Sequence, residues 1–336
     1  METLSTIESL VEGGERHFGR FAKTPIANPF DATRGPTLAY DWFRTKEWVG
    51  FTLIHHDLAS SMIIQDAKYL ATSEFYIFDR HEKDLFQYSA NRIAHPLHLP
   101  SDLLHDSCTF ASSAYGVGYS FELDQVRVVI DIAATKTAPA VKGRLSLDSD
   151  HASPPLVVSA RMPDGGTMYT NKIVYPVSGV IVCGERRYVF NPKKDFAILD
   201  EHKSRLPYRT DWTWGTFAMP VTGGITGANL AIRPALEGEQ EECCIWTPTA
   251  AEPLADVSFT PLGDDDLSPW HIASEDGRVD VTFTPEGHKA VNQNLLVAQI
   301  EYAQWYGHYD GILQGADKAW SVKGVPGVVE KMHARL

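Results

Sequence analysis

The sequence predicts an all-β protein that consists of two copies of one antiparallel unit. Its apolar segments are short, rich in β-branched and aromatic residues, and separated by glycine, proline and aspartate, a pattern typical of strands joined by turns. In addition, four short motifs recur in the same order at an offset of about 165–170 residues. Each unit has a size suited to an up-and-down barrel or a strongly curved sheet that closes its own edges.

The strands are predicted from the apolar runs in chain order. They cover residues 48–54, 74–78, 126–132, 155–160, 172–182, 187–190, 242–246, 257–260, 271–274 and 279–284. Residues 95–105 contain two prolines and are expected to form a loop. Asp276-Gly277 is typical of a two-residue hairpin turn, because glycine accepts a positive φ. Helices are expected only near the two ends, over residues 5–11 and 325–335.

The recurring motifs divide the chain into an N-terminal arm over 1–37, a first barrel over 38–165 and a second barrel over 166–336. We expect the arm to pair with a barrel, because its Gly-Glu-Arg motif recurs in the second unit. The alternative is an unrepeated β-sandwich in which short strand motifs coincide. The motif pairs are Gly14-Glu15-Arg16 with Gly184-Glu185-Arg186, Arg44-Thr45 with Arg209-Thr210, Glu74 and Ile77 with Glu242 and Ile245, and Gly143 and Leu145 with Gly311 and Leu313.

Composition and charge exclude several classes of protein. The chain of 336 residues has a formal net charge of −13, and its lysines and arginines are scattered, so no basic face for nucleic acid is expected. No apolar run reaches membrane-spanning length, and the N-terminus resembles neither a secretory signal nor a transit peptide. We expect a cytoplasmic monomer or homodimer. The cysteines Cys108, Cys183, Cys243 and Cys244 lack metal-site spacing and are expected to be reduced thiols.

Residues 191–229 concentrate the side chains that can carry chemistry. Proton carriers, a guanidinium and flat apolar rings occur close together here and nowhere else in the chain. We therefore expect the functional site in this segment. The side chains concerned are Asp200, Glu201, His202, Lys203, Tyr208, Arg209, Asp211, Trp212 and Trp214.

The same segment carries a family resemblance. Asn171-Lys172, residues 196–200 and residues 207–215 resemble motifs of a large bacterial family of unassigned activity, domain-of-unknown-function family 2804. The resemblance covers nearly the whole chain and departs at residues 201–204, where the family more often carries Trp and Gly after the aspartate. Further matching positions are 18–23, 227–230, Trp270, 276–285, Gly307, Gly311, Gly324, Gly327 and Glu330.

This family looks related to lipocalin-like two-barrel proteins, among them carotenoid hydratases, tocopherol cyclases and fungal cyclases that act on polyene or decalin products. The relationship implies two lipocalin-like (calycin-type) antiparallel barrels with an apolar pocket, in agreement with the repeated motifs. It does not supply a reaction, so a function has to be argued from the site itself.

The candidate catalytic residues are Asp200, His202, Tyr208 and Arg209. In an apolar barrel mouth Asp200 would lose its hydration and stay protonated as a general acid; alternatively, it forms a structural ion pair with Arg209. His202 can relay a proton to Asp200 if both side chains share a strand face, or it can be a surface residue. Tyr208 can donate a hydrogen bond to a developing oxyanion or anchor a corner.

The candidate binding residues surround this group. Trp212 and Trp214 alternate with polar residues, so both indoles face one side of a strand. They form either a core wall or the surface on which a flat hydrophobic or cationic guest lies. Asn229 would project inward and bind a carbonyl or hydroxyl group, or pair with backbone. Asn171, Trp246 and Trp270 are weaker candidates that line a pocket or serve the core.

These observations lead to a cofactor-independent acid–base enzyme, an isomerase, hydratase or cyclase, that acts on an apolar small molecule. The alternatives are a carrier of a lipophilic ligand and a carbohydrate-binding β protein. No metal site is expected, because His55-His56-Asp57 and His95 with His98 lack further ligands. The glycine-rich residues 222–227 lack the lysine and following helix of a phosphate-binding loop, and no serine or cysteine sits in a nucleophile elbow.

Overall fold

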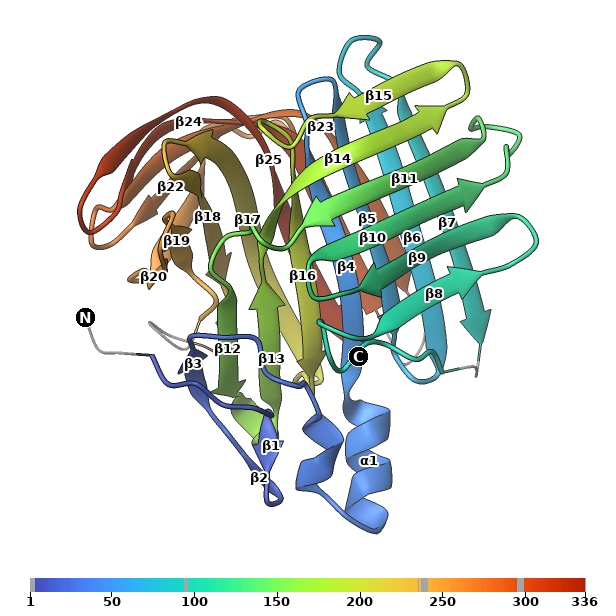
Figure 1. Ribbon diagram of the computed structural model, residues 1–336, viewed down its shortest axis with the longest axis vertical. Coiled ribbons are helices and arrows are strands. Elements are labelled where there is room, and N and C mark those ends of the chain that lie inside the picture. The colour runs from blue at the N-terminus through green and yellow to red at the C-terminus, as the bar shows by residue number, and fades with distance from the viewer. Residues whose placement is uncertain (1–3, 94–95, 235, 237–240, 295–298, 336) are drawn as a thin grey trace.

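Two strongly curled antiparallel sheets make up most of the described part of the chain and stand side by side (Figure 1). The structure is a computed structural model that describes residues 4–93, 96–234, 236, 241–294 and 299–335. The arrangement confirms the predicted all-β class with two curled antiparallel units. Within the described residues, no helix is long and apolar enough to cross a membrane.

The larger sheet wraps around its own core. In β10, Val126, Val128 and Ile130 are buried between the exposed Arg127 and Asp131, because alternate side chains of a strand face opposite sides. Along the sheet the strands follow the order β7-β6-β5-β4-β16-β14-β11-β10-β9-β8. They are β4 (Lys46–Ile54), β5 (Leu58–Asp66), β6 (Leu70–Asp79), β7 (Leu85–Ile93), β8 (Ser107–Ala111), β9 (Tyr115–Phe121), β10 (Gln125–Ile132), β11 (Val141–Asp148), β14 (Val174–Cys183) and β16 (Phe196–Ser204).

The N-terminal arm pairs with this sheet, as predicted. Its strand β3 (Gly19–Phe21) pairs with β12 (Leu156–Arg161), and Leu10 and Val11 pack with Tyr169 in a small cluster of their own. The arm thereby covers one end of the larger sheet (Figure 1). The remaining elements of this half are β1 (Val11–Glu12), β2 (Glu15–Arg16), η1 (Pro29–Ala32), α1 (Pro36–Arg44), η2 (Pro163–Gly165), β13 (Thr167–Lys172) and β15 (Arg186–Phe190).

The second sheet begins at β17 and contains the longest strands. Bulges between Pro285 and Gly287 and between Tyr309 and Gly311 bend these strands and help the sheet to curl. Its order is β20-β19-β18-β17-β25-β24-β23-β22-β21. The strands are β17 (Arg209–Val221), β18 (Gly224–Ile232), β19 (Cys244–Trp246), β20 (Ala251–Pro253), β21 (Val257–Pro261), β22 (Trp270–Ser274), β23 (Val279–Asn294), β24 (Gln299–Gln314) and β25 (Ala319–Arg335).

Both predicted terminal helices are wrong. Residues 325–335 belong to β25, which is paired with β17 on one side and β24 on the other. Pro326, Gly327 and three valines of this segment disfavour a helix, and the two flanking strands outweigh the helix propensity of the rest. In residues 5–11, Ser5 and Ser9 form isolated bridges instead of a helical turn. The helix near this end is α1, which begins at Pro36, where the missing N–H of proline costs nothing.

The predicted hairpin at Asp276-Gly277 is present but longer than two residues. Gly277 has a φ of 71°, and Ala273 pairs with Asp280 across the hairpin. The register therefore leaves a loop of more than two residues between β22 and β23. The predicted loop over 95–105 is confirmed for its described part, which contains no strand from 96 to 105.

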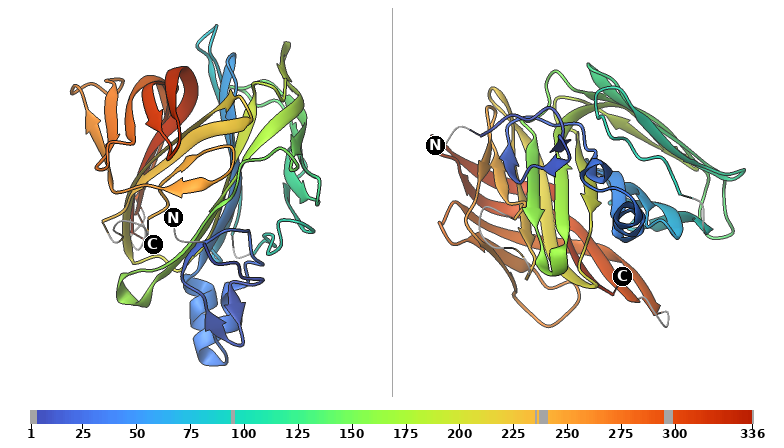
Figure 2. Two further views of the ribbon diagram at one scale, coloured as in Figure 1. Left: turned by 60° about the vertical axis from the view of Figure 1, so that its left-hand side comes forward. Right: turned by 90° about the horizontal axis from the view of Figure 1, so that it is seen from below.

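The two sheets meet through the faces that point away from their own cores (Figure 2). β4 lies at this contact and is buried on both faces, which explains why its burial does not alternate. Phe78 of the first sheet packs on Tyr306 of the second, with ring centroids 4.3 Å apart. The chain passes from the larger sheet to the second sheet between Ser204 and Arg209, so β13 to β16 belong to the larger sheet.

The domain division at 165/166 and the internal duplication stay predictions.

Candidate active site

A cluster of ionisable side chains lies between the two sheets. Asp200 and His202 of β16 point toward the second sheet, and Glu201 between them points into the first core. The His202 Nε2 atom is 3.6 Å from Asp200 Oδ1, as expected for two residues that share a strand face. We call the group formed by Lys172, Asp200, His202, Arg233, Glu242 and Glu330 the interface cluster.

Lys172 is the central cation of the interface cluster. Its Nζ lies 2.5 Å from Asp200 Oδ1, 3.3 Å from Glu242 Oε2 and 3.4 Å from His202 Nε2. Burial alone would lower the pKa of this ammonium, but the charges of Asp200 and Glu242 outweigh burial and raise it. Lys172 therefore stays charged, although its side chain is almost completely buried.

Glu242 and His202 complete the buried part of the cluster. Burial raises the pKa of Glu242, but the charges of Arg233 and Lys172 lower it by more than burial raises it. The net pKa of Glu242 is therefore far below the ordinary value. Arg233 Nη2 binds Glu242 at 2.5 Å, and the Thr170 hydroxyl donates to it at 2.8 Å. Burial lowers the pKa of His202, so its ring is neutral at neutral pH.

Tryptophan side chains enclose these charges. Trp48 stacks on His202 with centroids 4.4 Å apart and donates its Nε1–H to Asp200 Oδ2 at 3.2 Å. Trp212 stacks on Trp48 at 6.2 Å, and the Lys172 ammonium lies 5.0 Å from the Trp214 ring. The predicted pair of tryptophans thus faces the cluster from the second sheet, which gives the charges flat apolar walls.

Asn229 positions this wall and is not free to bind a ligand. Its Oδ1 accepts from Trp214 Nε1 at 2.9 Å, and its Nδ2 donates to the Glu242 carbonyl at 2.5 Å. Asn229 is completely buried. It therefore fixes the indole of Trp214 and the backbone that carries Glu242.

Glu330 brings a second carboxyl group to the partly exposed edge of the cluster. It accepts hydrogen bonds from Trp212 Nε1 at 2.8 Å, from the Tyr302 hydroxyl at 2.9 Å and from Gln304 Nε2 at 3.0 Å. Burial raises its pKa, and the charge of Asp200 raises it further. The Asp200 side chain is 23% exposed, and Glu330 is partly exposed.

The expected ion pair between Asp200 and Arg209 is absent from the described residues, and Lys172 takes its place. The reason is that β16 ends at Ser204 and the chain crosses to the other sheet before Arg209. Arg209 and Tyr208 are both exposed at the start of β17, with Tyr208 48% exposed. They lie outside the interface cluster.

The remaining predicted residues also lie elsewhere. Asn171 faces Glu201 inside the first sheet, with Nδ2 3.4 Å from Glu201 Oε2. Trp246 is completely buried in the apolar contact between the sheets. Trp270 lies in the core of the second sheet, where the Lys331 ammonium is 4.7 Å from its ring.

Sequence reasoning missed Trp48, Lys172, Arg233, Glu242 and Glu330 as site residues. Two of them could have been found from the sequence, because Lys172 and Glu330 are among the positions that resemble the family. A lysine inside the apolar run 168–177 also indicates a buried, paired charge. Among the described residues there is no group of three or more His, Cys, Asp or Glu side chains arranged to hold a metal ion.

Comparisons with known proteins identify the family and the fold. A model of a family described as a domain of unknown function (DUF2804) matches residues 20–336. Comparison with curated proteins finds no match. The crystal structure of CghA with Sch210972 is similar at a TM-score of 0.54 and 10% identity, covering 87% of this chain and 88% of that one. A second CghA structure gives 0.53 and 11%, with the same coverage.

Kievitone hydratase from Nectria haematococca also matches, with a TM-score of 0.46 and 10% identity over 86% of this chain and 88% of that one. At these identities the likeness concerns the fold alone. The two CghA structures therefore agree with the two curled sheets, and any activity has to be argued from the interface cluster.

Proposed function

The chain belongs to the DUF2804 family, whose description names no activity, and we propose from the interface cluster that it is an acid–base enzyme without a redox step. In this proposal it hydrates, cyclises or isomerises an apolar small molecule held between the two sheets. Asp200 is the general base and Glu330 is the general acid. Trp48, Trp212 and Trp214 form the apolar walls against which the substrate lies.

One observation carries this proposal: the carboxyl groups of two partly exposed acidic residues have opposite surroundings. Asp200 is ion-paired with Lys172, and an ammonium partner stabilises a carboxylate, which is the form a base requires. Glu330 has a raised pKa because of burial and the nearby charge of Asp200, and a retained proton is what an acid requires. A carboxylate held by an ammonium group, together with a second carboxyl group of raised pKa, is an arrangement typical of base and acid partners.

The proposed reactions balance in atoms and electrons without an oxidant or a reductant. In a hydration, Asp200 takes a proton from water while the water oxygen bonds to one carbon of a double bond. Glu330 gives its proton to the other carbon, and solvent returns the proton from Asp200 to Glu330. In a cyclisation or isomerisation the same pair removes one proton and delivers another. Positive charge that develops on the substrate is stabilised by the faces of the indoles.

Further observations support a small-molecule ligand. CghA, which shares the fold at a TM-score of 0.54, was crystallised with Sch210972. The burial of Trp214, Trp246 and Trp270 disfavours a carbohydrate-binding protein, because sugar-stacking platforms have to be exposed. Burial of the charged groups inside the contact favours an enzyme over a carrier, since a carrier of an apolar ligand gains nothing from buried charges that are costly to desolvate.

The test combines native mass spectrometry with matched variants. The purified protein is incubated with a lipophilic extract of its source cells, and released small molecules are compared before and after. We expect a product that differs from its precursor by one water, or an isomer of equal mass. Asp200→Asn and Glu330→Gln should each lower turnover at least a hundredfold while retaining the ligand.

The matched control is Asp280→Asn, because Asp280 is an exposed carboxylate that pairs with His271 on the surface of the second sheet. This variant should turn over normally. A ligand recovered unchanged from the wild type and from all three variants would instead identify a carrier. Full turnover in Asp200→Asn would refute the assignment of the base.

A further inference from the structure

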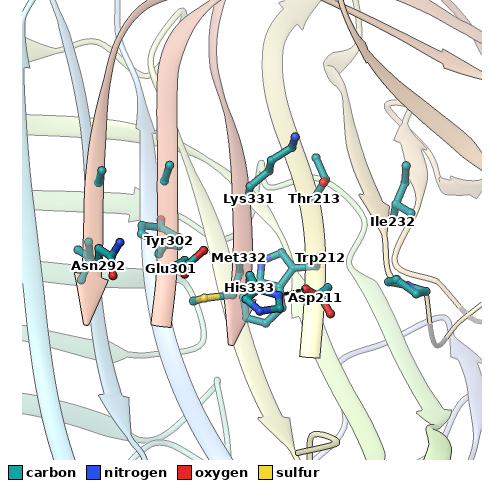
Figure 3. Close-up of a pocket in the computed structure, with 14 residues that line it drawn as sticks. Asp211, Trp212, Thr213, Ile232, Asn292, Glu301, Tyr302, Lys331, Met332 and His333 are labelled. Atoms are coloured by element: carbon teal, nitrogen blue, oxygen red, sulfur yellow. Dashed lines mark hydrogen bonds and ion pairs between the residues drawn. The ribbon is translucent and has the colours of Figure 1, made fainter. Parts of the chain in front are cut away.

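The concave side of the second sheet contains a hollow that the interface cluster does not use. It has a volume of about 500 Å³ and opens at the ends of β17, β23, β24 and β25 (Figure 3). Asp211, Lys331 and His333 belong to this face, because they alternate along their strands with Trp212 and Glu330. Trp212, Tyr302 and Met332 also border the hollow, and the Trp212 Nε1–H and the Tyr302 hydroxyl are bound to Glu330 on the opposite face. The hollow and the interface cluster are therefore neighbouring sites, and none of the six residues of the cluster lines the hollow.

The walls of the hollow are suited to an apolar body. Its volume lies within the range of about 300–1,000 Å³ that is typical of sites for small organic ligands. Apolar side chains come from β18, β23, β24 and β25 and from the second residue after β18. They are Ile232, Pro234, Ala290, Ala303 and Met332.

Lys331 supplies a cation at this wall. Its ammonium lies 4.7 Å from the centroid of the Trp270 ring, which holds it over the concave side of the sheet. In the part of the chain that the structure describes, no carboxylate forms an ion pair with it. Glu301, which also lines the hollow, instead accepts a hydrogen bond from Gln299 at 2.6 Å. The charge of Lys331 is thus available to an anionic ligand.

His333 adds an oriented second group beside Lys331. Its Nδ1 is hydrogen-bonded to Asp211, a contact drawn as a dashed line in Figure 3. This bond orients the ring, and because His333 lines the hollow, Nε2 is the ring nitrogen left for a ligand. A carboxylate placed at Nε2 favours the imidazolium form, which donates a hydrogen bond there while Asp211 balances its charge.

We propose that this hollow binds a small amphiphile that carries a single carboxylate. The apolar body lies against the walls, and the carboxylate binds the Lys331 ammonium and Nε2 of His333. The proposal is independent of the function proposed for the interface cluster, because the groups that bind the carboxylate, Lys331 and His333, lie on the opposite face of β25 from Glu330.

The test uses decanoate and decanol as probes, both below the concentration at which decanoate forms micelles. Titration calorimetry should show that the wild type binds decanoate more tightly than decanol, with an affinity that falls as salt is added. Lys331→Gln should weaken decanoate binding at least tenfold and leave decanol binding unchanged. The matched control is Lys318→Gln, because the Lys318 ammonium lies over Trp320 at 5.9 Å and does not line the hollow.

A second variant locates the probe independently of charge. Ala303→Trp places an indole into the hollow from β24 and should abolish the binding of both probes, while Asp200→Asn should alter neither. Equal decanoate affinity in wild type and Lys331→Gln overturns the proposal, as does undiminished binding in a folded Ala303→Trp variant. Absence of decanoate binding to the wild type overturns it as well.

Discussion

Replacing Glu201 by glutamine should change how the stability of the protein depends on pH. Glu201 points from β16 into the core of the first sheet and is only 1% exposed. Asn171 donates to its Oε2, whereas its Oε1 has no hydrogen-bond partner among the described residues. Burial raises the pKa of Glu201 from 4.5 to about 7, although Lys203 and Asn171 act in the opposite direction.

The size and sign of the effect follow from this pKa. The folded state holds the proton more tightly than the unfolded state, so the stabilisation is complete below pH 4.5 and is lost as the pH rises through 7. The loss amounts to about 3 kcal/mol, at about 1.4 kcal/mol for each pH unit between the two values. Glutamine has nearly the same shape and does not ionise. Glu201→Gln should therefore match the wild type near pH 4.5 and exceed its stability at pH 8 by up to about 3 kcal/mol.

The assay is urea unfolding of both proteins at several values between pH 5 and pH 8, followed by tryptophan fluorescence and circular dichroism. The difference in unfolding free energy should grow with pH and level off above pH 7. Glu275→Gln is the control, because Glu275 lies in the exposed loop between β22 and β23 and its replacement should give a flat difference. A flat difference for Glu201→Gln would refute the reasoning from burial.

Three other predictions concern the interface cluster and the bend of the second sheet. Lys172→Met leaves the carboxylates of Asp200 and Glu242 without their shared cation and should lower the free energy of unfolding by about 3–5 kcal/mol in urea titrations; an unchanged unfolding midpoint would contradict the pairing. Turnover should fall as the pH rises through the raised pKa of Glu330, because a general acid acts only while protonated, and the pH profile of kcat checks this; a profile that rises over that range would reverse the assigned role. Gly311→Ala should cost about 1–3 kcal/mol in thermal unfolding, since a φ of 144° strains any side chain at this bulge; no loss of stability would indicate that the strand relaxes there.

The candidate site was predicted only in part from the sequence. Trp212 and Trp214 were expected on one strand face because side-chain alternation is a local property, and the structure has them together at the interface cluster. Asp200 and His202 share a face for the same reason. The partner of Asp200 was predicted incorrectly, because proximity in sequence suggested Arg209, whereas the partner Lys172 lies 28 residues away on another strand.

The C-terminal segment also shows that local sequence does not determine long-range pairing. Within residues 325–335 only the last six have a composition that favours a helix, and the whole segment forms the end of β25 between two partner strands. Propensity differences amount to a few tenths of a kcal/mol per residue, and a full set of ladder contacts on both sides exceeds them. Pairing of this kind depends on which strands lie next to each other, and the local sequence does not contain that information.

The sequence by itself determined the all-β class, the positions of ten of the strands and the faces on which neighbouring side chains lie, because each depends on residues within a few positions of one another. Only the tertiary structure decided which faces meet. The contact of the two sheets brings Lys172 and Asp200 close to Glu242 and Glu330. Lys172 and Glu330 are 158 residues apart in the sequence. Burial in that contact then sets which of these groups hold a proton, because the cost of removing a charge from water depends on the surrounding fold.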